Sequence, residues 1–268
     1  MILISRGFAL HASVSSLIAR RCAFHSLNTV HTSQRGSLGD RLIHVDENDK
    51  VLGYISKLDG HLADSIKKRI THRAFSVFMF SRTDSSLLIQ KRADTKIVFP
   101  RQWANTCCSH PLYVPDEMDS NRNMGIKRAA SKRMDAELSI SDLAADNFSF
   151  KDKIVYRQLS PSGVYGESEV DYILFSLLDK PINPPFNPDE VEETYWVPPG
   201  PSDDRTQFLR EFIASQTRQG FPATPWFSLM MNDPDCLPKW WSEIMANADE
   251  FLSSEFDPNK NKIRSFLH

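Results

Sequence analysis

Strand-like and helix-like segments follow one another through the middle of this 268-residue chain, and their order restricts its fold more than any other feature. The stretch 72–80 is rich in aromatic and β-branched residues, and 86–91 follows it after a polar turn, which predicts two consecutive strands. Apolar residues recur at helical spacing in 123–138, beside a basic face. Two more strands are predicted at 153–158 and 170–178. We therefore expect an α+β fold with one mixed β-sheet flanked by helices.

Shorter elements complete the expected domain. A polar cluster between two short apolar runs is typical of a hairpin, and the C-terminal part carries one strand-like and two helix-like stretches. These elements, a hairpin, an edge strand and two helices, are predicted at residues 44–54, 195–197, 203–215 and 240–252.

The first 39 residues differ in composition from the rest. They contain no Asp or Glu, are rich in Ser, and include an amphipathic stretch at 8–19. Their basic residues are Arg6, Arg20, Arg21 and Arg35. This composition is typical of a mitochondrial or plastid transit peptide, and a disordered tail with no address is the alternative. We expect residues 1–39 to be such a segment and 40–268 to form one domain, with a mitochondrial destination; plastid, peroxisomal and cytoplasmic locations stay open.

Charge and composition exclude several classes of protein. A net charge of −2 argues against a general nucleic-acid binder, so no nucleic acid is expected as a partner. No apolar run reaches the roughly 18 residues that span a bilayer, so no membrane span is expected. The four cysteines form a poor disulfide framework, which favours a reducing compartment. Whether the chain is a monomer or a homodimer stays open.

The motif Asn-Thr-Cys-Cys-Ser-His-Pro at 105–111 contains a thiol and an imidazole two residues apart. In an extended segment Cys108 and His110 would point to the same side, whereas Cys107 would point to the other. A thiol beside a metal or another cation can be deprotonated near neutral pH. The alternative is two small cysteines buried in a strand, where a free Cys packs like an apolar residue.

A second group could bind a metal. Glu167 and Glu169 are two apart at the start of a predicted strand, so both carboxylates can face one point. Three imidazoles, those of His61, His72 and His110, would complete a set suited to octahedral Mg²⁺ or Mn²⁺ or to a distorted Zn²⁺ site. The alternatives are a solvated strand end and structural histidines.

A third group is basic. Lys57, Arg92 and Lys96 lie close to the predicted strands, and Arg133 and Glu137 are four apart on one helix face. They would form either ordinary solvated ion pairs or a diphosphate clamp. In a clamp, the guanidinium groups hold phosphate oxygens and the carboxylate holds a bridging Mg²⁺.

Several motifs, in order and at matching spacing from about Leu42 to Trp241, resemble type I isopentenyl-diphosphate isomerase of the Nudix-like superfamily. They are the runs that start at His72 (HRAFSVF), Gln90 (QKRADTK), Asn105 (NTCCSHP), Arg128 (RAA), Ala136 (AEL), Pro161 (PSG), Gly166 (GESEVDYIL) and Thr224 (TPW).

The resemblance implies an isomerase of isoprenoid biosynthesis. It would interconvert isopentenyl diphosphate and dimethylallyl diphosphate by protonation and deprotonation through a carbocation. The implied catalytic residues are Cys108, Glu169 and Tyr156. The implied metal ligands are His61, His72, His110, Glu167 and Glu169 for a divalent metal (Mg²⁺, Mn²⁺ or Zn²⁺), and Glu137 for the Mg²⁺ that accompanies the diphosphate. The implied substrate contacts are Lys57, Arg92, Lys96, Arg133 and Trp226.

The chain departs from the family pattern at three positions. Ser139 and Arg101 stand where Gly is usual, which puts the end of one helix and the loop before Cys108 in doubt. Ser168 stands between the two glutamates, where His is frequent, and is expected to point away from the metal.

Two other functions are alternatives to this isomerase. A Nudix-type hydrolase of a nucleoside diphosphate derivative would share the fold. Residues 131–137, however, keep only Glu137 of the paired glutamates that such a hydrolase needs, and hydrolysis has no use for Cys108 opposite Glu169. A catalytically inert binding module does not explain why every expected site group is present.

Overall fold

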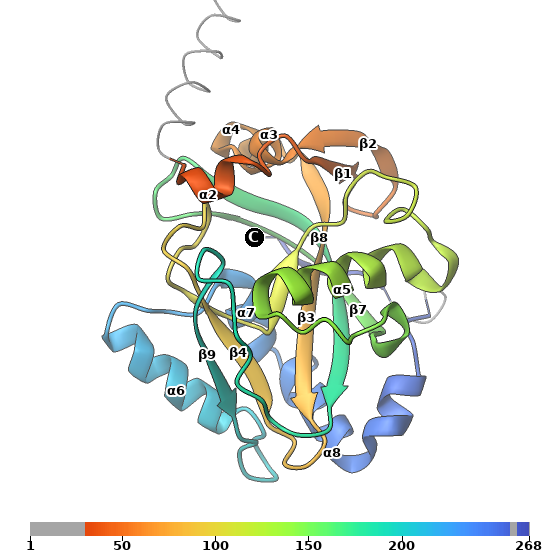
Figure 1. Cartoon of the computed structure of the whole chain (residues 1–268), viewed down its shortest axis with the longest axis vertical. Coiled ribbons are helices and arrows are strands. Elements are labelled where there is room, and N and C mark those ends of the chain that lie inside the picture. Colours follow the sequence, from red (N-terminus) through yellow and green to blue (C-terminus); the bar gives the residue numbers. More distant parts are fainter. Residues whose placement is uncertain (1–29, 258–261, 268) are drawn as a thin grey trace, which may run out of the picture.

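The structure is a computed structural model that describes residues 30–257 and 262–267, so residues 1–29 of the expected transit peptide lie outside it. Ten strands of this described part form one mixed sheet, in which β10, β7, β8, β3, β1 and β2 lie side by side in that order (Figure 1). Strand β4 pairs with β3, β5 and β9, and β6 pairs with β3. The strands are β1 (Arg41–Val45), β2 (Val51–Ser56), β3 (Thr71–Ser81), β4 (Leu87–Arg92), β5 (Trp103–Ala104), β6 (Cys107–Ser109), β7 (Ser149–Leu159), β8 (Gly166–Leu178), β9 (Val191–Val197) and β10 (Arg264–Phe266).

Helices cover both faces of the sheet (Figure 1). They are α2 (Thr32–Arg35), α3 (Lys57–His61), α4 (Ala63–Lys67), α5 (Met124–Leu138), α6 (Gln207–Arg218), α7 (Pro225–Asn232) and α8 (Leu237–Ser253). Helix α5 contributes Ile126, Ala129 and Met134 to one hydrophobic cluster, whereas α7 and α8 contribute Phe227 and Trp241 to another.

Strand β3 contributes side chains to both hydrophobic clusters, because successive side chains of a strand point to opposite faces of the sheet. Phe75 and Val77 belong to the cluster under α5, and Phe78 and Phe80 belong to the cluster under α7 and α8. All four are fully buried, and each such side chain contributes about 1.5–3 kcal/mol. A strand buried on both faces reads as an almost continuous apolar run, which is why its sequence predicted a strand so clearly.

The expected α+β fold with a mixed, helix-flanked sheet is confirmed. The hairpin is β1–β2, and its turn is held by Asp46, whose Oδ1 accepts from the backbone of Asn48 and Lys50 at 2.9 Å. The helix expected from residue 203 begins at Gln207 instead. Asp204 Oδ1 accepts hydrogen bonds from the backbone and hydroxyl of Thr206, which holds a turn before the helix.

Residues 30–39 belong to the packed structure, although they were expected to be part of a tail. Val30 and Leu38 are buried in the cluster under α7 and α8. The backbone N–H of Leu58 donates to the Leu38 carbonyl at 3.0 Å, which ties this segment to α3. The composition is acid-free up to Gly39, but packing depends on apolar side chains that composition does not locate.

None of the helices in the described part is long and apolar enough to cross a membrane.

The two positions where the family usually has Gly adopt the left-handed backbone conformation that Gly favours. Ser139, which ends α5, has φ of 52°, and Arg101 has φ of 59°. The chain therefore keeps the helix end and the loop before Cys108, at a cost of about 1–2 kcal/mol for each non-glycine residue.

Candidate active site

The register of β3 and β8 sets the centre of the candidate site. These strands run parallel with His72 beside Glu169, and β7 runs antiparallel to β8 with Tyr156 opposite Glu169. Strand β6 places Cys108 beside Ser76 of β3. One short stretch of sheet thus brings together four residues that are up to about a hundred positions apart in sequence.

Four predicted metal ligands converge. One ligand atom from each of His61, His72, His110 and Glu167 lies within 4.8 Å of every other. The distances from Glu167 Oε2 to Nε2 are 3.0 Å for His61, 3.6 Å for His72 and 4.0 Å for His110. Both ring nitrogens of His72 and Oε2 of Glu167 are buried without a hydrogen-bond partner. Such orphaned atoms, three imidazoles and a carboxylate fit a divalent cation.

Neighbouring groups orient these ligands. Nδ1 of His61 donates to the carbonyl of Lys57 at 2.6 Å, one turn earlier in α3, which leaves Nε2 free to face the cluster. Glu169 lies beside the group, with Oε1 at 2.7 Å from His110 Nε2 and 3.5 Å from His72 Nε2. Ser168 points away, as expected, and its hydroxyl bonds to that of Thr71 at 3.0 Å.

Burial and the nearby carboxylates shift the pKa values of the histidines in this cluster. Burial alone would lower the pKa of His72, but its contacts with Glu167 and Glu169 outweigh burial and raise the pKa to about 9. Burial lowers the pKa of His110 to about 4, against the opposing effect of Glu169. The two carboxylates therefore favour positive charge at this point, which a divalent cation would supply.

The two cysteines of the motif face different surroundings. Cys108 lines the cavity, with Sγ 3.6 Å from Nη1 of Arg92. Burial raises the pKa of Cys108 to about 12 even though Arg92 opposes the shift. Burial therefore outweighs Arg92 in its effect on the pKa of this thiol, and whether a cation deprotonates it stays a prediction. Cys107 contacts Glu137 instead, with Sγ 3.4 Å from Oε2.

Asn105 fixes the position of Trp226, whose ring forms an aromatic wall of the cavity. Its Oδ1 accepts from Nε1 of Trp226 at 3.0 Å, and its Nδ2 donates to the Val77 carbonyl at 3.0 Å. The Trp226 ring packs against Tyr156, with 5.9 Å between centroids, and Cζ of Arg92 lies 5.5 Å from the centre of the indole. Tyr156 in turn donates a short hydrogen bond to Glu169.

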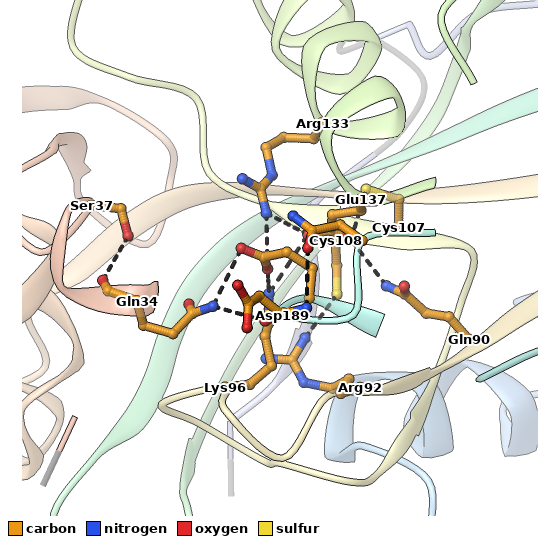
Figure 2. A network of polar contacts seen from close by, with 12 residues as sticks. Gln34, Ser37, Gln90, Arg92, Lys96, Cys107, Cys108, Arg133, Glu137 and Asp189 are labelled. Carbon is orange, nitrogen blue, oxygen red and sulfur yellow. Dashed lines mark hydrogen bonds and ion pairs between the residues drawn. The ribbon is translucent and has the colours of Figure 1, made fainter. Parts of the chain in front are cut away.

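The basic residues meet two carboxylates at the other end of the cavity (Figure 2). Arg133 Nη2 lies 2.5 Å from Glu137 Oε1 and 3.2 Å from Glu190 Oε2. Lys96 Nζ lies 2.5 Å from Glu190 Oε2 and 3.6 Å from Glu137 Oε1. Burial, reinforced by repulsion from Lys96 and Arg133, lowers the pKa of Lys57 to about 8. Lys57 therefore belongs to the same electrostatic cluster.

Most of the predicted site residues line this one cavity, and two lie behind its wall. His72 is fully buried beside Glu167, and Glu137 is buried beneath Arg133. The predicted site residues that line the cavity are Lys57, His61, Arg92, Lys96, Cys108, His110, Arg133, Tyr156, Glu167, Glu169 and Trp226.

Sequence reasoning missed three contributors. Asn105 is predicted only as part of its motif, and nothing in the sequence marks it as the partner of Trp226. Glu190 closes the Asn-Pro-Asp-Glu run after the Pro-rich stretch, and nothing else in the sequence marks it. Gln34 lies in the segment 1–39 that the composition predicts to be a transit peptide or tail, yet it lines the cavity.

Comparison with known proteins gives one consistent family. No family model matches the chain. Isopentenyl-diphosphate delta-isomerase of Phaffia rhodozyma is 38% identical over 84% of this chain and 85% of its own length. Isopentenyl-diphosphate Delta-isomerase I of Clarkia breweri is 41% identical over 76% of this chain and 69% of its own length. Isopentenyl-diphosphate Delta-isomerase 1 of Mus musculus is 36% identical over 81% of this chain and 92% of its own length.

Solved structures are more distant. A Deinococcus radiodurans protein is 18% identical, with a TM-score of 0.46 over 74% of this chain and 99% of its own. A NUDIX hydrolase from Alicyclobacillus acidocaldarius is 11% identical, with a TM-score of 0.45 over 68% of this chain and 96% of its own. The sequence relatives decide the assignment, because each is more than 30% identical and the match spans over two thirds of its length. The chain belongs to the isopentenyl-diphosphate delta-isomerase family.

Proposed function

We propose that the protein is a metal-dependent isopentenyl-diphosphate delta-isomerase, which interconverts isopentenyl diphosphate and dimethylallyl diphosphate in isoprenoid biosynthesis. One observation carries the proposal. In a member of this family, a single cavity is lined by the thiol of Cys108, the carboxylate of Glu169 and the ring of Trp226, with basic side chains at one end.

The reaction needs two groups that exchange protons with carbon. Isopentenyl diphosphate has an unactivated terminal alkene, and a proton added to its CH₂ end gives a tertiary carbocation. Loss of a different proton, from the carbon nearer the diphosphate, gives dimethylallyl diphosphate. In our proposal Cys108 and Glu169 are these two groups, one donating and the other accepting, and Tyr156 assists Glu169 through their hydrogen bond.

The carbocation must be protected from water and stabilised. Trp226 is 3% exposed, and Asn105 fixes its orientation. An aromatic face stabilises a desolvated cation by about 2 kcal/mol. The apolar wall around the indole also excludes water that would trap the cation.

Two divalent cations enter the proposal. One would be held by His61, His72, His110, Glu167 and Glu169, a ligand set that suits Mg²⁺, Mn²⁺ or Zn²⁺. This cation would fix Glu169 and tune its pKa. Glu137 would bind the Mg²⁺ that accompanies the diphosphate. Lys57, Arg92, Lys96 and Arg133 would contact the phosphate oxygens, because they are the cations at that end of the cavity.

The test is an assay of the full chain with isopentenyl diphosphate, with and without a chelator. We expect dimethylallyl diphosphate to form, to incorporate deuterium from D₂O, and to stop forming when the metal is removed. Release of phosphate from nucleoside diphosphate derivatives, without isomerisation, would instead support the Nudix-type hydrolase.

For cellular location, we propose a mitochondrial address in the acid-free N-terminal segment. The relatives from Arabidopsis thaliana and Cannabis sativa are named chloroplastic, so a plastid address is the alternative to include in the test. A fluorescent reporter fused behind residues 1–39 should collect in an organelle. A diffuse cytosolic signal would contradict the proposal.

A further inference from the structure

A short N-terminal segment touches the basic end of the cavity. Gln34, in α2, is 4% exposed and lines the cavity. Its Nε2 donates to the Asp189 carbonyl at 3.0 Å (Figure 2). The same Nε2 donates to Glu190 Oε1 at 3.3 Å. A buried glutamine amide with two acceptors, one of them charged, is held in a defined place.

Glu190 connects Gln34 to the cationic side chains. Gln34 binds Oε1 of its carboxylate, while Oε2 binds Lys96 at 2.5 Å and Arg133 at 3.2 Å. Because one amide occupies the first oxygen, the second is turned toward the two basic side chains. Gln34 therefore fixes the direction from which Glu190 holds Lys96 and Arg133.

The same segment also reaches a third cation. Lys57 Nζ donates to Ser37 Oγ at 3.3 Å, and Ser37 Oγ donates to the Gln34 carbonyl at 3.2 Å. Three of the four basic residues assigned to the diphosphate are thus connected to residues 34–37, two of them through Glu190 and one through Ser37.

We propose that Gln34 is a positioning residue for the diphosphate, acting through Glu190 on Lys96 and Arg133. The inference rests on the proposed isomerase function and adds to it a residue outside the motifs that mark the family in this sequence. Gln34 holds the cations in the arrangement that receives the diphosphate, and it does not take part in proton transfer.

The first test is steady-state kinetics of Gln34→Ala in the full chain. We expect the KM for isopentenyl diphosphate to rise roughly five- to tenfold, because a hydrogen bond to a charged group is lost. The value of kcat should stay within about twofold, since the diphosphate is held alike in ground and transition states.

Thr95→Val is the matched control. Thr95 Oγ1 donates to the Asp189 carbonyl at 2.7 Å, so it anchors the same loop as Gln34 through the same atom. We expect its KM to be unchanged, because it is not bonded to Glu190. Equal increases of KM in both variants would mean that Gln34 only anchors the loop, and would overturn the inference.

A double-mutant cycle tests the path. On a Glu190→Gln background, Gln34→Ala should add less than about twofold to KM, because the effect is carried by the Glu190 carboxylate. If the two substitutions raise KM independently, so that their fold-changes multiply, the proposed action of Gln34 through Glu190 is overturned. If Gln34→Ala fails to fold, Gln34→Glu keeps the shape, sets two carboxylates together, and should raise KM at least as much; an unchanged KM there would also refute the inference.

The outcomes separate the two proposals. A wild-type chain that does not isomerise isopentenyl diphosphate refutes the proposed function. An active wild-type chain whose KM does not respond to Gln34→Ala refutes only the role of Gln34.

Discussion

Cys107 and Cys108 are consecutive residues of β6, yet their thiols meet different groups: Cys107 Sγ lies 3.4 Å from Glu137 Oε2, and Cys108 Sγ lies 3.6 Å from Arg92 Nη1. Cys107 belongs to the cluster under α5, whereas Cys108 packs beside the opposite cluster. This is the alternation of side chains that a strand imposes. Only the second thiol lines the cavity with Glu169.

The first prediction follows from that difference. Cys108→Ala and Cys108→Ser should abolish isomerisation while the fold persists, because the proposed proton-transfer group is lost. Cys107→Ala should keep most of the turnover, since its thiol is directed away from the cavity. Turnover numbers and thermal unfolding curves of the variants decide the matter. An essential Cys107 beside a dispensable Cys108 would contradict the assignment.

The second prediction concerns Tyr156, which stands opposite Glu169 in the β7–β8 ladder and donates to its carboxylate. Tyr156→Phe should lower kcat by roughly 10²-fold with little change in KM, as expected for a group that assists proton transfer. Tyr172→Phe is the control. Tyr172 lies in the same sheet and donates the same kind of hydrogen bond to a carboxylate, that of Asp49, but it does not line the cavity. Similar losses of kcat in both would indicate a structural effect.

The strands and the shared side of Glu167 and Glu169 could be predicted because their signals are local, whereas the roles of the other site residues are implied by the resemblance to a family. Residue spacing within one strand placed Glu167 and Glu169 on one side and turned Ser168 away, and the structure agrees. The order of apolar and helical stretches also indicated a mixed sheet. Both conclusions rest only on local patterns: the alternation of side chains along a strand and the spacing of apolar residues along a helix.

The remaining contributors depend on long-range packing. Gln34 and Glu190 meet across 156 positions, and neither residue type in its local sequence marks a site. The raised pKa of Cys108 could not be predicted either, because the effect of burial on the thiol exceeds that of the nearby Arg92. Burial of an ionisable group is set by the assembled fold.

The third prediction is loss of metal from the cluster. His72→Ala and Glu167→Gln should each lower the bound divalent metal, measured by elemental analysis, because each removes a group that converges on the same point. His44→Ala is the control, since His44 is the register partner of His72 on β1 but lies outside the cluster. Full metal content in both cluster variants would refute the site.

The fourth prediction concerns stability at the end of α5. Ser139 has φ of 52°, and its hydroxyl donates to the Pro185 carbonyl at 2.7 Å. Ser139→Gly should have a free energy of unfolding about 0.5–1 kcal/mol above that of Ser139→Ala, because both lose the bond and relief of the left-handed strain in the glycine variant exceeds the extra freedom of its unfolded chain. Ser139→Ala keeps the strain and loses the bond, so it should be destabilising by about 1 kcal/mol. Denaturant unfolding of both variants measures this difference; a glycine variant that is no more stable than the alanine variant would contradict the prediction.

The fifth prediction concerns binding of the diphosphate. Lys96 lies between Glu137 and Glu190 and lines the cavity, so its ammonium group is placed to meet phosphate oxygens. Lys96→Met should raise KM about tenfold, which corresponds to the loss of one charge-assisted bond. Lys91→Met is the matched control, because Lys91 is also buried but pairs with Glu192 at 2.9 Å and does not line the cavity. The rise in KM for Lys96→Met should shrink at high salt, which weakens binding by the intact cations as well. An unchanged KM in Lys96→Met, with normal dependence on Mg²⁺, would mean that the diphosphate binds elsewhere.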